Sequence, residues 1–289
     1  MKTSGLFETH SFNIPCSYGK AIRIVVFGDV HWDSPNHADA VWQEDLEYFR
    51  GLPLKETYFL GMGDYLDSTS TTERECLGQI SKQMHETFKR DTQALQQAKI
   101  DKFADEISFM KGRLIGLLNG NHYFEFQSGI NGDQKLADKL DCKYLGVCAL
   151  IRLSLVAHGR CQTIDIFAHH GMGASRLIGG SINRVAQMFE GVEADIAIMG
   201  HDHKRGAMPT TPRLFLHCDH RTGALKVKQR ESWAIRSGSY LASFRAGESN
   251  YNVDACRMPS SLGHVEILVT LHNRGDKERE VETQIRCLA

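Results

Sequence analysis

The sequence predicts an α/β fold with parallel strands, and three features indicate it. Runs of β-branched and aromatic residues at Ala21–Phe27 and 57–60 have the composition of buried strands. The segment 38–50 between them carries apolar residues at helical spacing, so the three together form a right-handed βαβ unit. After residue 204 the pattern changes to short alternating strands, which predicts a second sheet packed on the first.

The segment 72–111 predicts two helices, because it is rich in Glu, Gln, Lys, Ala and Met and has no proline. We expect a break between them near Asp91. Two interpretations stay open: an amphipathic pair packed on the sheet, or an insertion that forms a lid or binds a partner. The other expected elements are strands at 113–118, 149–157, 163–168 and 195–199, helices at 133–140 and 181–190, and late strands near 214–217, 224–227, 233–235, 265–271 and 281–285. A hairpin turn is expected at His158 and Gly159.

The composition is that of a globular protein, with 42% hydrophobic and 24% charged residues in 289. No linker rich in Pro, Gly and Ser interrupts it, so we expect residues 1–289 to form a single domain with a helical insertion at about 72–111. The formal net charge of -1 lacks the basic excess of many nucleic-acid-binding proteins, although a local basic patch stays open.

The eight cysteines include no C-x-x-C pair, so a zinc ribbon or a redox motif is not expected. Residues 1–20 lack the apolar core of a signal peptide. No run approaches the roughly 18 apolar residues of a membrane helix. We therefore expect a cytoplasmic location, free thiols and no membrane partner.

Five loops share one construction, in which a predicted strand is followed by Asp, Asn or His. These candidate residues are Asp29 and His31, Asp64 and Asp67, Asn121 and His122, His169 and His170, and His201 and His203. The carboxyl ends of strands in an open α/β sheet gather at one edge, so these side chains are expected to lie together. Any one of these loops alone would be read as a turn, and any one histidine as a core residue. Their recurrence indicates a site instead.

The residue types in these loops suit two-metal hydrolysis. Mixed carboxylate, imidazole and amide ligands fit Mn, Fe, Zn or Co, and the absence of cysteine from the loops argues against a structural zinc ion. Two divalent ions about 3.5–4 Å apart can share a carboxylate and stabilise charge on a phosphoryl group under attack.

The motifs also resemble a known family. Gly-Asp-Val-His at 28–31, Gly-Asp-Tyr-Leu-Asp at 63–67, Gly-Asn-His at 120–122, His-His-Gly at 169–171 and Gly-His-Asp-His at 200–203 stand in the order found in calcineurin-like metallophosphoesterases. The chain looks most like the small stand-alone members found in bacteria and phages. The resemblance implies a four-layer α-β-β-α sandwich of two mixed β-sheets flanked by helices.

The resemblance also implies two ligand sets for two divalent metal ions, Mn first and Fe, Zn or Co as alternatives. The first set is Asp29, His31, Asp64 and His203. The second is Asp64, Asn121, His169 and His201, so that Asp64 bridges the ions. The family usually has its ligand directly after the strand and before x-Gly, so His169 is preferred as the ligand and His170 is left as a substrate contact.

Family roles extend to the catalytic side chains. His122 would contact the substrate and protonate the leaving oxygen, and Asp67 would orient His122 through a hydrogen bond. Asp202, between two ligands, is expected to point away. For substrate phosphate, Arg176 in the Gly-rich loop 171–180 is the first candidate cation. Arg184, Lys204 and Arg205 are the others, and solvated surface charge is the alternative for each.

Two positions bear on the substrate. Family members that act on phosphoproteins have Arg and Glu where this chain has Ser68 and Tyr123. The expected reaction is therefore hydrolysis of a phosphodiester or a nucleotide-type phosphoester by attack of a metal-bound hydroxide. Tyr123 either stacks on a base or sugar or simply packs. Two alternatives stay open: a DNA or RNA nuclease acting in a complex, with the 72–111 helices as the docking surface, or a non-catalytic scaffold subunit of the same fold.

Overall fold

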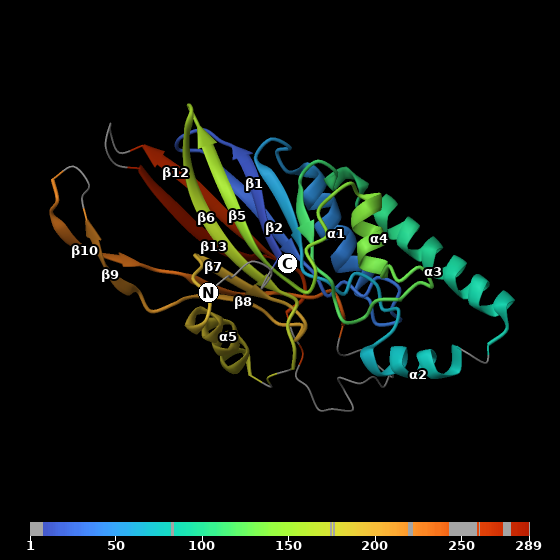
Figure 1. The fold of residues 1–289 in the computed structure, drawn as a ribbon. Coiled ribbons are helices and arrows are strands. Elements are labelled where there is room, and N and C mark those ends of the chain that lie inside the picture. The colour runs from blue at the N-terminus through green and yellow to red at the C-terminus, as the bar shows by residue number, and fades with distance from the viewer. Residues whose placement is uncertain are drawn as a thin grey trace.

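Two mixed β-sheets form the centre of the molecule (Figure 1). The computed structural model describes residues 8–81, 84–173, 175, 177–218, 222–242, 259, 261–273 and 279–288. One sheet contains, in order, β13 (Arg279–Leu288), β12 (His264–Asn273), β2 (Ala21–Phe27), β3 (Thr57–Gly61) and β4 (Leu114–Leu117). The other contains β1 (Glu8–Pro15), β5 (Cys148–Ala157), β6 (Arg160–His169), β7 (Ile196–Met199), β11 (Trp233–Ser237) and β8 (Arg205–Pro209).

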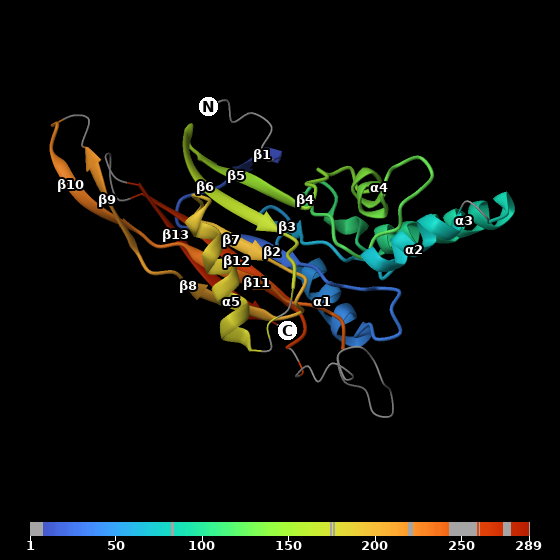
Figure 2. The ribbon, with the colours of Figure 1, turned by 60° about the horizontal axis from the view of Figure 1, so that its bottom comes forward.

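Three apolar clusters define four layers, which confirms the expected sandwich. The largest lies between the sheets and includes Ile24 and Ile166. A second joins the outer face of the five-stranded sheet to α1 (Asp39–Gly51), α3 (Glu86–Glu106) and α4 (Gly132–Lys139). The third joins α5 (Ile178–Ala186) to β7 and β11 of the other sheet (Figure 2). Each sheet thus buries both faces.

Local sequence accounts for the helices that cover the five-stranded sheet. In α1, Trp42, Leu46 and Phe49 recur at helical spacing and are all buried. Helix α4 begins after Asn131, whose side chain accepts a hydrogen bond of 2.8 Å from the backbone N–H of Gln134. The βαβ prediction is also confirmed, because β2 and β3 pair in parallel and flank α1.

The late strands do not form the one additional sheet that the sequence predicts. Strand β12 pairs with β2 in the first sheet, and β11 pairs with β7 in the second. The ribbon of β9 (Arg213–Cys218) and β10 (Leu225–Arg230) stands apart. Strands β1 and β8 were not expected at all. An alternating pattern identifies a strand and its buried face, but its partners depend on the path of the whole chain.

The segment 72–111 contains α2 (Thr71–Ser81), α3 and a short 3-10 helix, Ser108–Met110. Helix α2 ends at Ser81 and α3 begins at Glu86, so the expected break near Asp91 is wrong, because Asp91 lies inside α3. The packed interpretation is confirmed for the C-terminal half of α3, and a lid or a partner-binding insertion stays a prediction. The C-terminal half of α3 buries Ile100 and Phe103 in the core, whereas Phe88 and Leu95 in its N-terminal half are exposed. In both views this half of α3 and the β9–β10 ribbon extend from opposite ends of the molecule (Figures 1 and 2).

Two smaller expectations concern the hairpin and the membrane. His158 and Gly159 form the predicted turn between β5 and β6, with φ of 48° and 71°. Among the residues described, no helix has the length and apolar character needed to span a bilayer.

Candidate metal centre

The five loops meet at one edge of the two sheets. Four of them begin directly after β2, β3, β4 and β7, and the fifth includes the last residue of β6. Backbone hydrogen bonds join neighbouring loops: the N–H of Asp29 donates to Gly63 O at 2.9 Å, and that of His31 donates to Asp64 O at 3.0 Å. The N–H of Gly200 donates to His170 O at 2.9 Å. Side chains far apart in the sequence are thereby held in one cluster.

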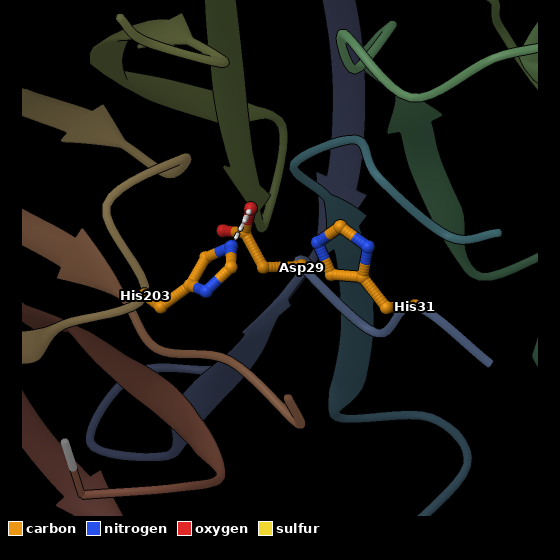
Figure 3. A group of neighbouring side chains, drawn as sticks. All are labelled: Asp29, His31 and His203. Atoms are coloured by element: carbon orange, nitrogen blue, oxygen red, sulfur yellow. Dashed lines mark ion pairs between the residues drawn. The ribbon is translucent and has the colours of Figure 1, made fainter. Parts of the chain in front are cut away.

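Asp29, His31 and His203 form the first group of potential ligands (Figure 3). One ligand atom from each lies within 4.8 Å of the others, and His203 Nε2 is 3.7 Å from Asp29 Oδ1. Asp29 and His31 are buried. Among the described residues, neither ring nitrogen of His31 has a hydrogen-bond partner of good geometry, although Asp67 Oδ1 lies 3.3 Å from Nδ1, and this is unusual for a buried imidazole. A cation coordinated by this group would give such a nitrogen a partner.

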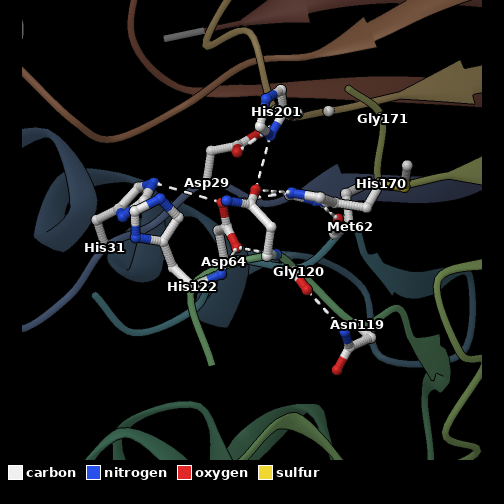
Figure 4. A network of polar contacts seen from close by, with 12 residues as sticks. Asp29, His31, Met62, Asp64, Asn119, Gly120, His122, His170, Gly171 and His201 are labelled. Carbon is white, nitrogen blue, oxygen red and sulfur yellow. Dashed lines mark hydrogen bonds and ion pairs between the residues drawn. The ribbon is translucent and has the colours of Figure 1, made fainter. Parts of the chain in front are cut away.

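Asp64, His170 and His201 form the second group, again within 4.8 Å (Figure 4). Asn121 belongs with them, because its Oδ1 lies 2.9 Å from His170 Nε2 and 2.7 Å from His201 Nδ1. Two imidazoles and an amide oxygen thus converge on one point beside a carboxylate. This donor set fits a divalent transition-metal ion.

Asp64 lies between the two groups. Its Oδ1 accepts hydrogen bonds from the backbone N–H groups of Asn121 at 2.7 Å and His122 at 2.8 Å. Its Oδ2 lies 3.8 Å from His31 Nε2 and 3.3 Å from His170 Nε2. One carboxylate oxygen is therefore fixed by the backbone, and the other faces a member of each group.

The loops adopt backbone conformations that favour glycine. Seven described non-glycine residues have positive φ, and five of them are at this site: Asp29, His31, Asp64, His201 and His203. Each costs about 1–3 kcal/mol, and such strain clusters at functional sites. The motif glycines are also sterically required, because a Cβ on Gly120 would lie 2.0 Å from Asp64 Oδ1.

Burial and the charges of neighbouring groups strongly shift the pKa values of Asp29, Asp64 and His170. Burial raises the pKa of Asp29 to about 7, and the charge of Asp64 adds to this effect. For His170, burial alone would lower the pKa, but the charge of Asp64 and a hydrogen bond to it raise the pKa to about 10. The pKa of Asp64 is held well below its usual range: burial opposes this, but the charge of His170 and the hydrogen bond outweigh it. The two buried carboxylates thus attract positive charge, which metal ions would supply.

Asp67 and His122 form a hydrogen-bonded pair beside the first group, with Asp67 Oδ1 2.8 Å from His122 Nδ1. The pKa of Asp67 is depressed: partial burial opposes the shift, but the hydrogen bond from His122 and the close approach of the His31 ring outweigh it. Asp33 holds this pair in place, because its Oδ1 accepts the N–H of Asp67 at 2.6 Å while its Oδ2 pairs with Lys99 Nζ of α3 at 2.6 Å.

The choice between the two adjacent histidines requires a correction. The structure brings His170, not His169, to Asp64 and Asn121, while His169 Nδ1 accepts a hydrogen bond of 2.8 Å from the N–H of Gly171. Side chains alternate along a strand, so His170, four residues after the core residue Ile166, is expected on the same side of the chain as Ile166, and His169 on the other side. This alternation was visible in the sequence and would have identified His170.

The expected cationic contacts are only partly described. Arg176 lies outside the described residues. Arg184 Nη1 donates to Met172 O at 2.9 Å, and Lys204 Nζ donates to Ser175 O. Both cations are thus engaged with the 171–180 loop itself. Arg205 is the first residue of β8.

Asp202, as expected, takes no part in either ligand group. It is buried, and its Oδ2 accepts a hydrogen bond from Ser181 Oγ of α5 and lies 3.6 Å from Arg236 Nη2. Arg236 Nη1 in turn donates to Gly200 O at 2.8 Å. Asp202 and Arg236 therefore fix the loop that carries His201 and His203 against α5.

Three supporting residues escaped sequence reasoning. Arg74 Nη1 donates to Asn121 O at 2.7 Å, and Asp133 Oδ2 accepts the N–H of Gly120 at 2.8 Å. Asp33, described above, supports Asp67. None belongs to a motif, and Asp133 looks like an ordinary acidic residue in the first turn of α4. Only the tertiary arrangement brings them to the site.

No protein-family model and no curated protein sequence matches this chain. Solved structures to which the chain shows similarity include Vps29 from Chaetomium thermophilum, with 13% identity, a TM-score of 0.36, and coverage of 92% of this chain and 98% of that one. Another is a conserved protein from Streptococcus pneumoniae described as a predicted phosphoesterase, with 12% identity, a TM-score of 0.31, and coverage of 92% and 99%. A third is Chaetomium thermophilum Vps29 in complex with a cyclic peptide, with 12% identity, a TM-score of 0.28, and coverage of 92% and 96%. At this level of similarity, function has to be argued from the site itself.

Proposed function

We propose that this protein is a phosphoesterase that uses two divalent metal ions to hydrolyse a phosphodiester or a nucleotide-type phosphoester. The observation that carries the proposal is the placement of Asp64, whose Oδ2 faces His31 of one ligand group and His170 of the other. A carboxylate shared by two ligand groups is the arrangement that two-metal hydrolases require.

Each of the two ligand groups would bind one metal ion. Asp29, His31 and His203 would hold one ion and Asn121, His170 and His201 the other, with Asp64 between them. Imidazole nitrogens with carboxylate and amide oxygens suit Mn first, and Fe, Zn or Co as alternatives. When bound, such ions supply positive charge beside the phosphoryl oxygens and lower the pKa of a water molecule.

His122 is the group that would give a proton to the leaving oxygen. Its Nδ1 faces Asp67 Oδ1 at 2.8 Å, which places the N–H of a neutral ring on Nδ1 and fixes the ring orientation. Protonation of Nε2 makes it an acid, and the ionised Asp67 stabilises the resulting imidazolium. The side chain of His122 remains partly exposed, so a substrate can reach it.

Two side chains support a diester or nucleotide over a phosphoprotein. Ser68 Oγ donates to Gln96 Oε1 of α3 at 2.9 Å. The ring of Tyr123 is stacked by the guanidinium of Arg74, 3.8 Å from its centroid. Neither position supplies the Arg or Glu of the phosphoprotein-directed members, and both side chains are held by the helices of segment 72–111.

A metal and substrate panel tests the proposal. Purified protein reconstituted with Mn, Fe, Zn or Co is analysed for metal content and assayed with bis(p-nitrophenyl) phosphate, p-nitrophenyl phosphate, a phosphopeptide, and single- and double-stranded DNA. We expect metal-dependent cleavage of the diester and little cleavage of the phosphopeptide. Fewer than about one ion per chain after reconstitution, without hydrolysis, would support the scaffold interpretation. Cleavage of the diester with both DNA forms intact would exclude a stand-alone nuclease.

A further inference from the structure

A pocket of about 380 Å³ lies between α2, α3 and the segment 124–129, outside the two ligand groups. Its apolar wall consists of Leu77, Met84, Phe88, Phe124 and Phe126. Polar side chains complete it, and these are Thr69, Arg74, Lys89, Thr92, Gln93, Glu125 and Gln127. An aromatic, partly polar lining of this kind is typical of a small-molecule site.

The pocket adjoins the catalytic loops. Thr69 follows Asp67 by two residues and Phe124 follows His122 by two, and two residues span at most about 7 Å of chain. Thr69 Oγ1 donates to Tyr123 O at 2.6 Å, which joins the two loops. Arg74 lines the pocket and also donates to Asn121 O at 2.7 Å. A group in this pocket would therefore lie close to the loops that carry Asp67, Asn121 and His122.

The charges around the pocket are already engaged. Arg74 Nη1 donates to the carbonyls of Thr69, Asn121 and Tyr123. Lys89 Nζ pairs with Glu86 Oε1 at 2.7 Å. An anionic occupant thus has no uncommitted cation among the described lining residues, which favours a neutral one.

The side chains that remain available to a ligand in this pocket are mainly aromatic. Phe88 is 57% exposed although it is a large apolar side chain. Phe124 and Phe126 pack edge to face with ring centroids 5.1 Å apart, and Lys135 Nζ lies 4.4 Å from the Phe126 centroid. The hydroxyl of Thr92 adds a group that can bond the edge of a flat heterocycle. Gln93 lines the pocket as well, but its amide is already bonded to Lys89 O and to the N–H of Gln127. A flat, neutral ring with polar edges is the best match to these walls.

We propose that this pocket binds the nucleobase of a nucleoside phosphoester whose phosphate lies at the Asp64 centre. The inference rests on the proposed function, because it names the substrate class of that same centre. The helices of segment 72–111 then supply specificity: α2 and the N-terminal half of α3 form the base subsite, and the C-terminal half of α3 packs on the sheet.

Matched ligands isolate the contribution of the base. AMP and UMP are each compared with ribose 5-phosphate, which carries the sugar phosphate without the base. Dissociation constants are measured by calorimetry on the metal-reconstituted protein, and inhibition constants against bis(p-nitrophenyl) phosphate. We expect at least one nucleotide to bind about tenfold or more tightly than ribose 5-phosphate, the size of effect usual for stacking one base on an aromatic ring.

Two exposed side chains of α3 provide the variants. Phe88→Ala removes a pocket wall and is expected to bring the affinity ratio of nucleotide to ribose 5-phosphate close to one. Leu95→Ala is the control, because Leu95 is 58% exposed on the same helix but does not line the pocket. Leu95→Ala is expected to keep the wild-type ratio of nucleotide affinity to ribose 5-phosphate affinity. Both residues are exposed, so neither change should unfold the protein, and thermal unfolding checks this.

The outcomes separate the subsite from the proposed function. Diester hydrolysis with equal affinities for the nucleotides and ribose 5-phosphate would overturn the subsite and leave the phosphoesterase proposal intact. The subsite would also be overturned if Phe88→Ala kept the wild-type ratio of nucleotide affinity to ribose 5-phosphate affinity. Preferential nucleotide binding that depends on Phe88, in a protein that hydrolyses no phosphoester, would support the subsite and overturn the phosphoesterase proposal.

Discussion

Asp67 Oδ1 lies 2.8 Å from His122 Nδ1, and it also lies 3.3 Å from Nδ1 of His31. A single carboxylate thus reaches the imidazole assigned to proton donation and an imidazole assigned to metal binding. We expect Asp67→Asn to lower kcat by about 10²-fold, because the neutral amide no longer stabilises the His122 imidazolium. Metal content per chain should stay close to wild type. A parallel loss of metal would mean that Asp67 acts mainly through His31.

His122→Ala tests the proton donor directly. We expect kcat for an ester with a poor leaving group to fall by about 10²–10⁴, the usual size of a general-acid contribution. An activated ester such as bis(p-nitrophenyl) phosphate should lose less, because its leaving group needs little protonation. Metal content is the control, since the His122 side chain is in neither ligand group assigned to an ion. Equal loss with both kinds of ester would argue against proton donation.

His169 and His170 form a matched pair of adjacent residues for testing the ligand assignment. His170→Ala removes a ring 3.3 Å from Asp64 Oδ2, so it should lower the content of bound metal and abolish hydrolysis. His169→Ala removes an acceptor for the Gly171 N–H and a ring contact with Phe167, and neither involves Asp64, so this variant should keep most of its metal and its hydrolysis. Metal analysis of the two purified variants at matched metal concentrations distinguishes them. If His169→Ala lost its metal and His170→Ala kept it, His169 would be the ligand.

Asp133 predicts a pH dependence of stability. Burial raises its pKa to about 7, although the N–H of Gly120 opposes the shift. Between its ordinary pKa and about 7, the folded protein therefore keeps a proton that the unfolded chain has lost, so this group makes the folded state less stable as pH rises through that window. Asp133→Asn keeps an acceptor for Gly120 without the charge. With metal removed by a chelator, the variant should gain thermal stability over wild type at pH 8 but not at pH 5. A pH-independent difference would contradict the shift.

How much of the site could be predicted from the sequence depended on how local the signal was. A strand followed by Gly-Asp or Gly-Asn-His is a local pattern, so the loops of Asp29, Asp64 and Asn121 were located correctly. The choice of His169 failed because it followed the family's usual ligand position, directly after the strand and before x-Gly, and not the side-chain alternation that continues from β6. Arg74 carries no local signal, because its role depends on how α2 lies against the loop of Asn121.

For the fold, too, local features were predicted from the sequence and long-range pairings were not. Most strands and helices followed from their periodicity, and the family resemblance implied the four layers, but neither predicted the allocation of the late strands to sheets. Strand β12 returns to pair with β2 across more than half of the sequence, and no short-range pattern encodes that pairing. The ends of α2 and α3 were also misjudged, because Glu- and Lys-rich sequence favours helix on both sides of their break.

The central claim is that Asp64 joins two metal ions, and the metal stoichiometry of Asp64→Asn tests it most directly. We expect the Mn-reconstituted wild type to contain about two ions per chain and the variant to contain fewer, with turnover of bis(p-nitrophenyl) phosphate abolished. Asparagine keeps the oxygen that accepts the N–H groups of Asn121 and His122, so the loops should stay in place. A variant that binds two ions and turns over at the wild-type rate would contradict the account.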